Sequence, residues 1–141
     1  MNHFSDISKK RLSTCHRDLR ILFAHVINNY DCSIVCGHRD EAEQNKAFKE
    51  GKSQLQFPHS KHNRIPSEAV DAAPYEYSGI DWSVNQAIYF AGYVKGVADK
   101  LYTMGVISHR IRSGIDWNNN NDIDDTNFWD AYHFELIPNA K

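Results

Sequence analysis

Hydrophobic residues near the amino terminus recur at three- and four-residue steps, which is typical of an amphipathic helix. The pattern predicts one long helix between Asp6 and Asn29, with its stripe formed by Leu12, Cys15, Leu19, Leu22, Phe23, Val26 and Ile27. A second stripe predicts a helix that is capped by Asp81 or Ser83 and ends near Gly105. Its inward positions are Val84, Ala87, Ile88, Ala91, Val94, Ala98 and Leu101.

Short apolar or alternating segments predict the strands. These segments are Cys32–Cys36, 69–73, 106–112 and 132–136. In the last strand His133 and Glu135 share one face, because successive side chains point to opposite sides of a strand. The other face, formed by Tyr132, Phe134 and Leu136, is then the core side.

A third helix is predicted from Glu41 to Glu50, because Asp40 and Glu43 have the spacing of a capping box and Gly51 follows as a stop. This places Arg39 at a helix entrance. The segment 52–67 contains two prolines and predicts a long irregular loop, which in a compact domain indicates a site.

Length and composition indicate one soluble globular domain, residues 1–141. A formal net charge of -2 excludes a broad basic surface for nucleic acid or anionic lipid. Three cysteines cannot all pair, so we expect free thiols and folding in a reducing compartment. The first residues lack the apolar stretch of a secretory signal, and no segment is apolar enough to span a membrane. We therefore expect synthesis in the cytoplasm.

Two of the eight histidines, His62 and His133, lie in loop-to-strand contexts with carboxylates nearby. We expect four others, His3, His16, His25 and His109, to be packing or surface residues without an acidic partner. Catalytic zinc takes three ligands from His, Asp, Glu or Cys and keeps a position for water. His62, Asp71 and His133 can supply such a set, although spacing alone is not diagnostic.

Two alternatives remain open at this point. Cys32, Cys36 and His38 fall on one strand face and can be read as a metal site, but buried free cysteines are the commoner outcome for an apolar strand. Arg39 can be read as a surface partner of Asp40 or Glu43.

A polar run, 116–127, has oxygen donors at alternate positions in the manner of a calcium loop. The candidate calcium ligands are Asp116, Asn118, Asn120, Asp122 and Asp124. Asn121 and Asn127 stand where an EF-hand has glycine and glutamate, so the match is poor and a solvated loop is the alternative.

An ordered series of residues resembles the zinc peptidases of the D-alanyl-D-alanine carboxypeptidase and dipeptidase family. Within that family the chain is most similar to the small phage endolysins, the L-alanyl-D-glutamate peptidases. The most specific segments are SKH, AVD and DAYHFEL, and the resemblance runs from about Cys32 to Leu136. The series is Gly37, Arg39, Gln44, Phe48, Gly51, Ser53, Pro58, Ser60, His62, Ala69, Asp71, Trp129, Asp130, His133 and Glu135.

This resemblance implies an α+β zinc enzyme that cuts peptides of bacterial peptidoglycan. It implies His62, Asp71 and His133 as zinc ligands, Asp130 as general base and Arg39 as the cation at the carbonyl oxygen. It further implies substrate contacts from Ser60 and Gln44. Glu135 is interpreted as the residue that orients a ligand imidazole.

One departure from the family concerns the spacing of the ligands. Eight residues separate His62 from Asp71, more than in the common family pattern, and no glycine is among them. This leaves Glu68 as a less favoured substitute ligand for Asp71.

We therefore predict a monomeric peptidase that acts on the stem peptide without a separate wall-binding domain, nucleic acid or membrane insertion. Without a signal segment, it would reach the wall through a separate pore. The alternatives are a D-alanyl-D-alanine carboxypeptidase or dipeptidase, and a noncatalytic binding module stabilised by its metal.

Overall fold

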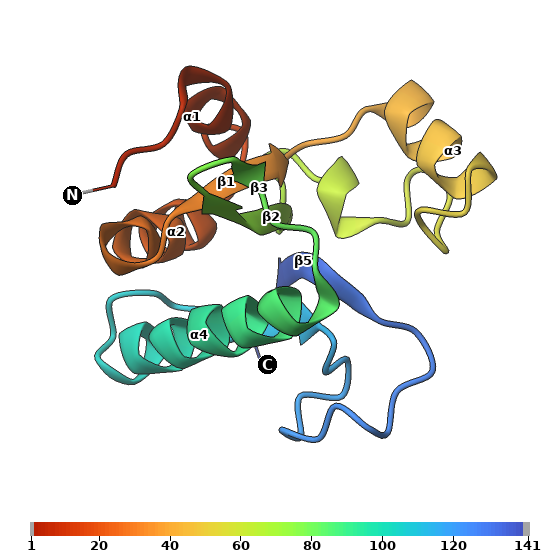
Figure 1. Cartoon of the computed structure of the whole chain (residues 1–141). Coiled ribbons are helices and arrows are strands. Elements are labelled where there is room, and N and C mark those ends of the chain that lie inside the picture. The colour runs from red at the N-terminus through yellow and green to blue at the C-terminus, as the bar shows by residue number, and fades with distance from the viewer. Residues whose placement is uncertain (1, 140–141) are drawn as a thin grey trace.

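An antiparallel sheet with helices packed on it forms the centre of the molecule. The computed structural model describes residues 2–139. Within them the strand order is β1-β2-β5-β4, and β3 pairs with β2 (Figure 1). The elements are α1 (Asp6–Leu12), α2 (Arg17–Asn29), β1 (Cys32–Cys36), α3 (Glu41–Lys49), η1 (Lys61–Asn63), β2 (Ala69–Glu76), β3 (Gly79–Ile80), α4 (Val84–Thr103), β4 (Ile111–Gly114) and β5 (Asp130–Leu136). The predicted α+β class is confirmed.

Phe134, on the central strand β5, joins the sheet to both long helices. Its ring lies 5.8 Å from that of Phe23 in α2 and 6.1 Å from that of Phe90 in α4, in edge-to-face arrangements. The stripes of α2 and α4 are buried against the same face of the sheet, and Figure 1 shows the two helices together on one side of it. The hydrophobic core therefore lies between this face and these helices.

The register of β2 and β5 gives the two faces of the sheet different chemistry. Val70 is paired with Phe134 and points to the core, whereas the next pair, Asp71 and His133, points to the opposite face. α3 and η1 lie on this second side (Figure 1). The polar side chains Asp71 and His133 therefore lie on the side of the sheet that is covered by the segment between β1 and β2.

The single helix predicted from Asp6 to Asn29 is wrong, because the chain divides there into α1 and α2. Ser13 caps α1, and the ring Nδ1 of His16 accepts a hydrogen bond from the Asp18 amide to begin α2. Between them the His16 amide donates to the Ser67 carbonyl at 2.8 Å. The hydrophobic spacing continues across the break, because Leu12 at the end of α1 and Cys15 between the two helices are both buried in the core.

The strand predicted at 106–112 begins late, at Ile111. The amides of Ser108 and His109 both donate to Asp18 Oδ2 at 3.0 Å, so they are not available to a sheet ladder. His109 Nδ1 also lies 2.8 Å from the same oxygen. The expectation that His109 has no acidic partner is therefore wrong.

The predicted start of α3 is confirmed in detail. Asp40 Oδ1 accepts from the Glu43 amide at 2.8 Å, and Glu43 Oε1 accepts from the Asp40 amide at 3.2 Å. This capping box holds the chain that follows β1, and with it Arg39, at the entrance to the helix. Among the described residues, no helix has the length and apolar character needed to cross a bilayer.

Candidate functional site

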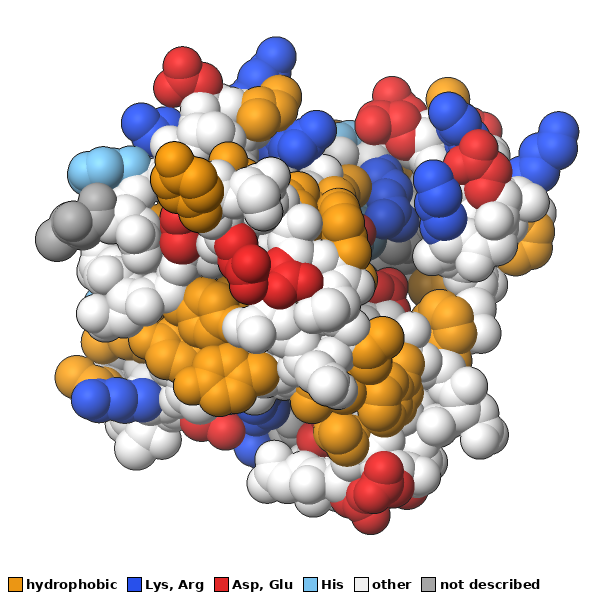
Figure 2. Space-filling view, viewed as in Figure 1, with side chains coloured by type: hydrophobic (Ala, Val, Ile, Leu, Met, Phe, Trp, Pro, Cys, Tyr) orange, Lys and Arg blue, Asp and Glu red, His pale blue; other side chains and the backbone are white. Residues whose placement is uncertain are grey.

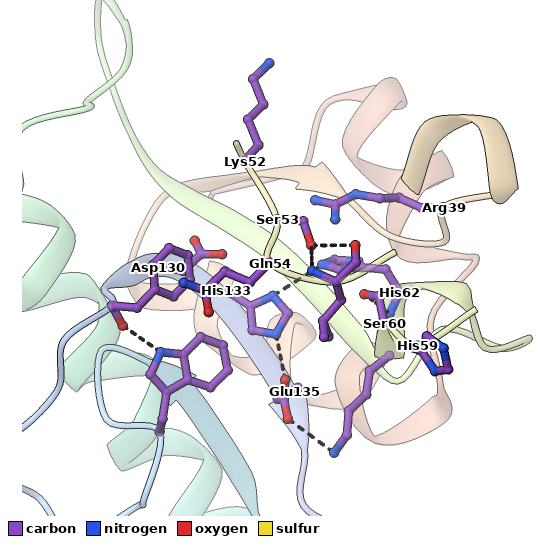
Figure 3. Close-up of a pocket in the computed structure, with 14 residues that line it drawn as sticks. Arg39, Lys52, Ser53, Gln54, His59, Ser60, His62, Asp130, His133 and Glu135 are labelled. Carbon is purple, nitrogen blue, oxygen red and sulfur yellow. Dashed lines mark hydrogen bonds and ion pairs between the residues drawn. The ribbon is translucent and has the colours of Figure 1, made fainter. Parts of the chain in front are cut away.

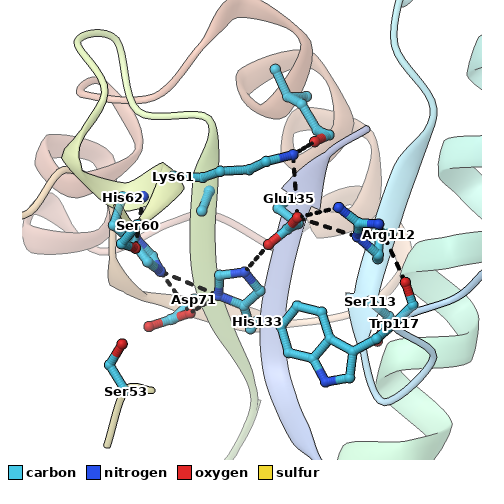
Figure 4. A network of polar contacts seen from close by, with 12 residues as sticks. Ser53, Ser60, Lys61, His62, Asp71, Arg112, Ser113, Trp117, His133 and Glu135 are labelled. Carbon is cyan, nitrogen blue, oxygen red and sulfur yellow. Dashed lines mark hydrogen bonds and ion pairs between the residues drawn. The ribbon is translucent and has the colours of Figure 1, made fainter. Parts of the chain in front are cut away.

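Three side-chain atoms from three separate elements converge on the polar face of the sheet (Figure 4). His62 Nε2 lies 3.2 Å from Asp71 Oδ1 and 3.3 Å from His133 Nδ1, and Asp71 Oδ1 lies 3.2 Å from His133 Nδ1. β2 and β5 supply Asp71 and His133 as a cross-strand pair. η1 supplies His62, whose carbonyl accepts from the Arg39 amide at 2.8 Å.

The outer nitrogen of each imidazole has an acceptor of its own. His62 Nδ1 lies 2.7 Å from the Gly37 carbonyl oxygen, and His133 Nε2 lies 2.8 Å from Glu135 Oε1. In the neutral rings these acceptors fix the proton on the outer nitrogens. The inner nitrogens and Asp71 Oδ1 then direct lone pairs toward one another, an arrangement that a cation stabilises.

The spacing of the three donor atoms fits a tetrahedral zinc ion. Zn–N and Zn–O bonds of about 2.0–2.1 Å at tetrahedral angles put the ligand atoms about 3.3 Å apart. The observed separations are 3.2 to 3.3 Å. A zinc ion held by these three residues would keep one position for water or substrate, as in catalytic zinc sites.

Gly37 is the residue whose carbonyl orients His62. A Cβ at this position would lie 2.3 Å from the Arg11 carbonyl oxygen and 2.3 Å from Thr14 Oγ1. Only glycine therefore lets the end of β1 lie this close to the end of α1.

Glu135, which accepts from His133, is itself held by two cations. Arg112 on β4 donates to Glu135 Oε2 from Nη2 at 2.7 Å and from Nε at 3.2 Å, and Lys61 Nζ lies 3.2 Å from the same oxygen. Burial raises the pKa of Glu135, but the hydrogen bond from His133 and these two cations outweigh it and lower the pKa to about 2. The carboxylate thus stays ionised and keeps the His133 ring in one orientation.

The charge balance of the triad depends on Asp71. Burial raises the pKa of Asp71, yet the neighbouring His62 and His133 outweigh it and hold the pKa well below its usual range. For the two imidazoles burial lowers the pKa, and Asp71 outweighs it: the pKa of His62 rises to about 10 and that of His133 rises as well. The site therefore attracts positive charge, as protons or as a metal ion.

Asp130, the predicted general base, lies beside the triad at the start of β5. One carboxylate oxygen lies within 4.8 Å of ligand atoms of Asp71 and His133. Burial, and then the charge of Asp71, raise the pKa of Asp130 above its ordinary value. Its backbone is packed against Gly114, where a Cβ would lie 2.1 Å from the Asp130 carbonyl oxygen.

Arg39 pairs with Asp71 rather than with Asp40 or Glu43. Its Nη2 donates to Asp71 Oδ2 at 2.9 Å and its Nη1 to Gln44 Oε1 at 3.3 Å. The surface-pair alternative is therefore wrong. Arg39 also lines the cavity in front of the triad.

Gln44, predicted to contact substrate, is fully buried and does not line this cavity. Its Nε2 donates to Ser53 Oγ at 3.0 Å and to the Leu55 carbonyl at 2.7 Å. Gln44 thus connects α3, Arg39 and the loop after α3.

A cavity of about 340 Å³ opens over the triad (Figure 3). Ser60 lies in its wall, with Oγ accepting from the His62 amide at 3.2 Å. Trp117 also lines it and packs on His133 with ring centroids 5.4 Å apart. The sequence-based prediction gives no role to Lys61, Arg112 or Trp117, because their contacts with Glu135 and His133 are long-range and arise only on folding.

The alternative ligands differ in how far they lie from the triad. Glu68 is turned toward Arg64, whose Nη1 lies 3.3 Å from Glu68 Oε1, so it is not a substitute for Asp71. Cys32 is buried, and burial raises the pKa of its thiol to about 12. Cys36 offers a sulfur within 4.8 Å of ligand atoms of His62 and Asp71, at the edge of the triad.

The loop 116–127 is ordered by its own side chains. Asp116 accepts from the amides of Asn120 and Asn121 at 3.2 and 2.8 Å, and Asp125 accepts from the side chains of Asn118 and Asn120. Within the described residues, no three carboxylates of this loop bring oxygens within 4.8 Å of one another. The carboxylates of this loop are therefore spread along it and alternate with asparagine amides.

Comparisons with known proteins agree with this geometry. A family model described as phage L-alanyl-D-glutamate peptidase matches residues 1–137. The L-alanyl-D-glutamate peptidase of Escherichia phage T5 is 31% identical over 139 residues, covering 95% of this chain and 97% of that protein. The crystal structure of the L-Ala D-Glu endopeptidase ChiX of Serratia marcescens matches with a TM-score of 0.69 at 20% identity, over 96% of this chain and 91% of that chain.

Proposed function

Because the chain belongs to the family of phage L-alanyl-D-glutamate peptidases, we propose that it lyses its host as a zinc enzyme built on His62, Asp71 and His133. Membership confirms the predicted class, a peptidoglycan hydrolase of the endolysin type that acts on the L-alanyl-D-glutamate bond. The identity of the metal and the role of each residue are our proposals.

The convergence of three lone-pair donors at 3.2 to 3.3 Å is the observation that supports zinc. The two outer acceptors, Gly37 O and Glu135 Oε1, prepare both imidazoles for a metal before it binds. When bound, zinc supplies Lewis-acid activation of water and of the scissile carbonyl.

Asp130 acts as the base of the reaction. It takes a proton from the attacking water and transfers it to the nitrogen of the leaving D-glutamate. The raised pKa of its buried carboxyl favours this transfer, because the protonated form is then a competent acid for the second step. Arg39 donates a hydrogen bond to the carbonyl oxygen as negative charge develops there, and Ser60 contacts the substrate backbone.

The test is Asp130→Asn, with zinc content measured alongside turnover of a purified stem peptide. We expect the metal to be retained and kcat to fall by about 10²- to 10⁴-fold, the usual contribution of a positioned base. Asp99→Asn, on the far side of α4, is the control for the same chemical change. Undiminished turnover in Asp130→Asn contradicts the mechanism.

The site of cleavage is tested by mass analysis of the fragments. Release of peptides that begin with D-glutamate supports the proposed bond. Release of D-alanine alone supports the alternative D-alanyl-D-alanine peptidase.

We propose Ca²⁺ as a second, weaker cation of the loop 116–127, held by oxygens of Asp116, Asn118, Asn120, Asp122 and Asp124. The alternation of oxygen donors is its support. The loop leads directly to Asp130, so ordering it would affect the base. Calorimetric titration with Ca²⁺ is the test, and equal heats from the chain and from Asp122→Asn contradict a site there.

The remaining proposals concern how the enzyme reaches its substrate. We propose a single catalytic domain that works as a monomer on the stem peptide and is released to the wall through a separate pore. Sedimentation at micromolar concentration tests the monomer. The release is tested by expressing the chain with and without a pore-forming protein. Lysis only when that protein is present supports the proposal.

A further inference from the structure

A second cavity of about 610 Å³ lies next to the first and shares four of its lining residues, Arg39, Lys52, Phe128 and Asp130. The two cavities therefore form one groove that passes the catalytic residues. Asp71 also lines the second cavity. Figure 2 shows this face of the molecule hollowed beside the lobe that carries α3.

Aromatic side chains line one wall of the second cavity. Trp82 and Trp129 lie on it together with Tyr132, and 56% of Trp82 and 41% of Trp129 are exposed. The opposite wall comes from α3 and offers Glu43 and Lys46 as hydrogen-bonding groups. An apolar wall that faces polar groups suits a ligand with both an apolar face and hydroxyl groups.

These rings are held in place although they are partly exposed to solvent. Trp82 and Tyr132 pack edge to face with centroids 5.1 Å apart, and Tyr132 Oη donates to the Trp82 carbonyl at 3.1 Å. Trp129 Nε1 donates to the Ile123 carbonyl at 3.1 Å. Large aromatic rings that are exposed but fixed are typical of binding surfaces, because little conformational entropy is lost on contact.

The substrate of the proposed reaction carries a sugar close to the bond that is cut. The amino group of L-alanine in the stem peptide is acylated by the lactyl ether of muramic acid. Six bonds join the scissile carbonyl carbon to the pyranose ring, as many as in two residues of extended chain, so the ring lies about 7 Å away. A groove that cuts this bond in the intact wall therefore meets the sugar beside the catalytic centre.

We infer that Trp82, Trp129 and Tyr132 form the subsite for the muramic acid ring, on the alanine side of the scissile bond. This inference rests on the proposed function. The faces of the aromatic rings pack against the apolar C–H face of the pyranose, since the negative ring face attracts weakly positive C–H groups. The first cavity, which the exposed His59 also lines, then takes the carboxylate-bearing D-glutamate side.

The subsite makes the enzyme discriminate between two substrates with the same scissile bond. One is an L-alanyl-D-glutamate peptide with a free amino end, and the other carries N-acetylmuramic acid on that amino group. The wild-type chain should have the higher kcat/KM for the muramyl peptide. Trp82→Ala should lower the ratio of the two kcat/KM values by about 5- to 30-fold, the effect of removing one stacked ring.

Trp82→Phe should restore most of the ratio, because it keeps an aromatic face. Tyr77→Ala removes an exposed ring outside the groove and is the matched control. An unchanged ratio in Trp82→Ala, or an equal loss for both substrates, overturns the subsite.

Binding of N-acetylmuramyl-L-alanine, followed by tryptophan fluorescence, separates this inference from the proposed function. We expect the dissociation constant to rise about 5- to 30-fold in Trp82→Ala. Hydrolysis of neither peptide by the zinc-loaded wild type refutes the proposed function, while Trp82-dependent binding of this probe still supports the subsite. Equal binding by the wild type and Trp82→Ala refutes the subsite whatever the activity.

Discussion

Glu135→Gln tests whether a residue that hydrogen-bonds to a proposed metal ligand, here His133, influences the affinity for the metal. Glu135 is only 8% exposed, and its two oxygens accept from His133 on one side and from Arg112 and Lys61 on the other. A glutamine has one acceptor oxygen. If that oxygen accepts from His133, the amide nitrogen faces two cationic donors, and in the opposite orientation it faces the imidazole N–H.

The substitution therefore loses at least one hydrogen bond in either orientation, and it removes the charge that increases the basicity of His133. Loss of such a partner typically weakens metal binding by about 10- to 100-fold, or about 1.4 to 2.7 kcal/mol. We expect a change of this size in the zinc dissociation constant, measured at neutral pH by competition with a chromophoric chelator.

Glu68→Gln is the control, because Glu68 pairs with Arg64 at the surface and is remote from the triad. Circular dichroism of the metal-free variants establishes that both are folded. A zinc affinity of folded Glu135→Gln within twofold of the wild type would refute the reasoning, since the carboxylate would then have no influence on the ligand it contacts.

Three further predictions follow from particular contacts. Removal of metal by a chelator should abolish hydrolysis and added zinc should restore it; full activity of metal-free protein contradicts the proposal. Asp18→Asn should lower the free energy of unfolding at pH 7, measured in urea, by about 1.5 to 3 kcal/mol, because it removes the charge that accepts hydrogen bonds from Ser108 and His109. Burial raises the pKa of Asp18, but these hydrogen bonds outweigh burial and lower the pKa. A lowered folded-state pKa stabilises above the unfolded value of about 3.9, so the difference from wild type should shrink below that pH, and a constant difference would exclude the ionised form as its cause. Gly37→Ala should lower the free energy of unfolding by about 1 to 3 kcal/mol, because the new Cβ forces the Arg11 carbonyl away. It should also weaken zinc binding. An unchanged melting temperature contradicts the close packing at Gly37.

Local patterns in the sequence predicted most of the elements. The capping box of Asp40 and Glu43, and the two faces of β5, are each determined by residues close in the chain, and the structure has both. The break between α1 and α2 was missed because its cause, the pairing of His16 with Ser67, is a long-range contact. The late start of β4 has the same kind of cause, since Asp18 binds the amides that precede it.

The residues of the candidate site also differ in whether the sequence could predict them. Resemblance to the family indicated His62, Asp71 and His133, and the structure brings their donor atoms together despite the longer segment between the first two. Arg112 was not predicted, because nothing in the sequence indicates that it lies opposite Glu135. Gln44 was assigned to substrate although it is buried, since a family pattern records which residue recurs and not whether it faces the ligand.

The position of β5 in the sheet has a consequence for when activity first arises during synthesis. β5 is the last strand in sequence, yet it lies between β2 and β4 and carries His133 together with Phe134. A nascent chain that has not reached this strand lacks both the complete core and the third side chain of the triad. We therefore expect activity to arise only after β5 has been synthesised and has paired with β2 and β4.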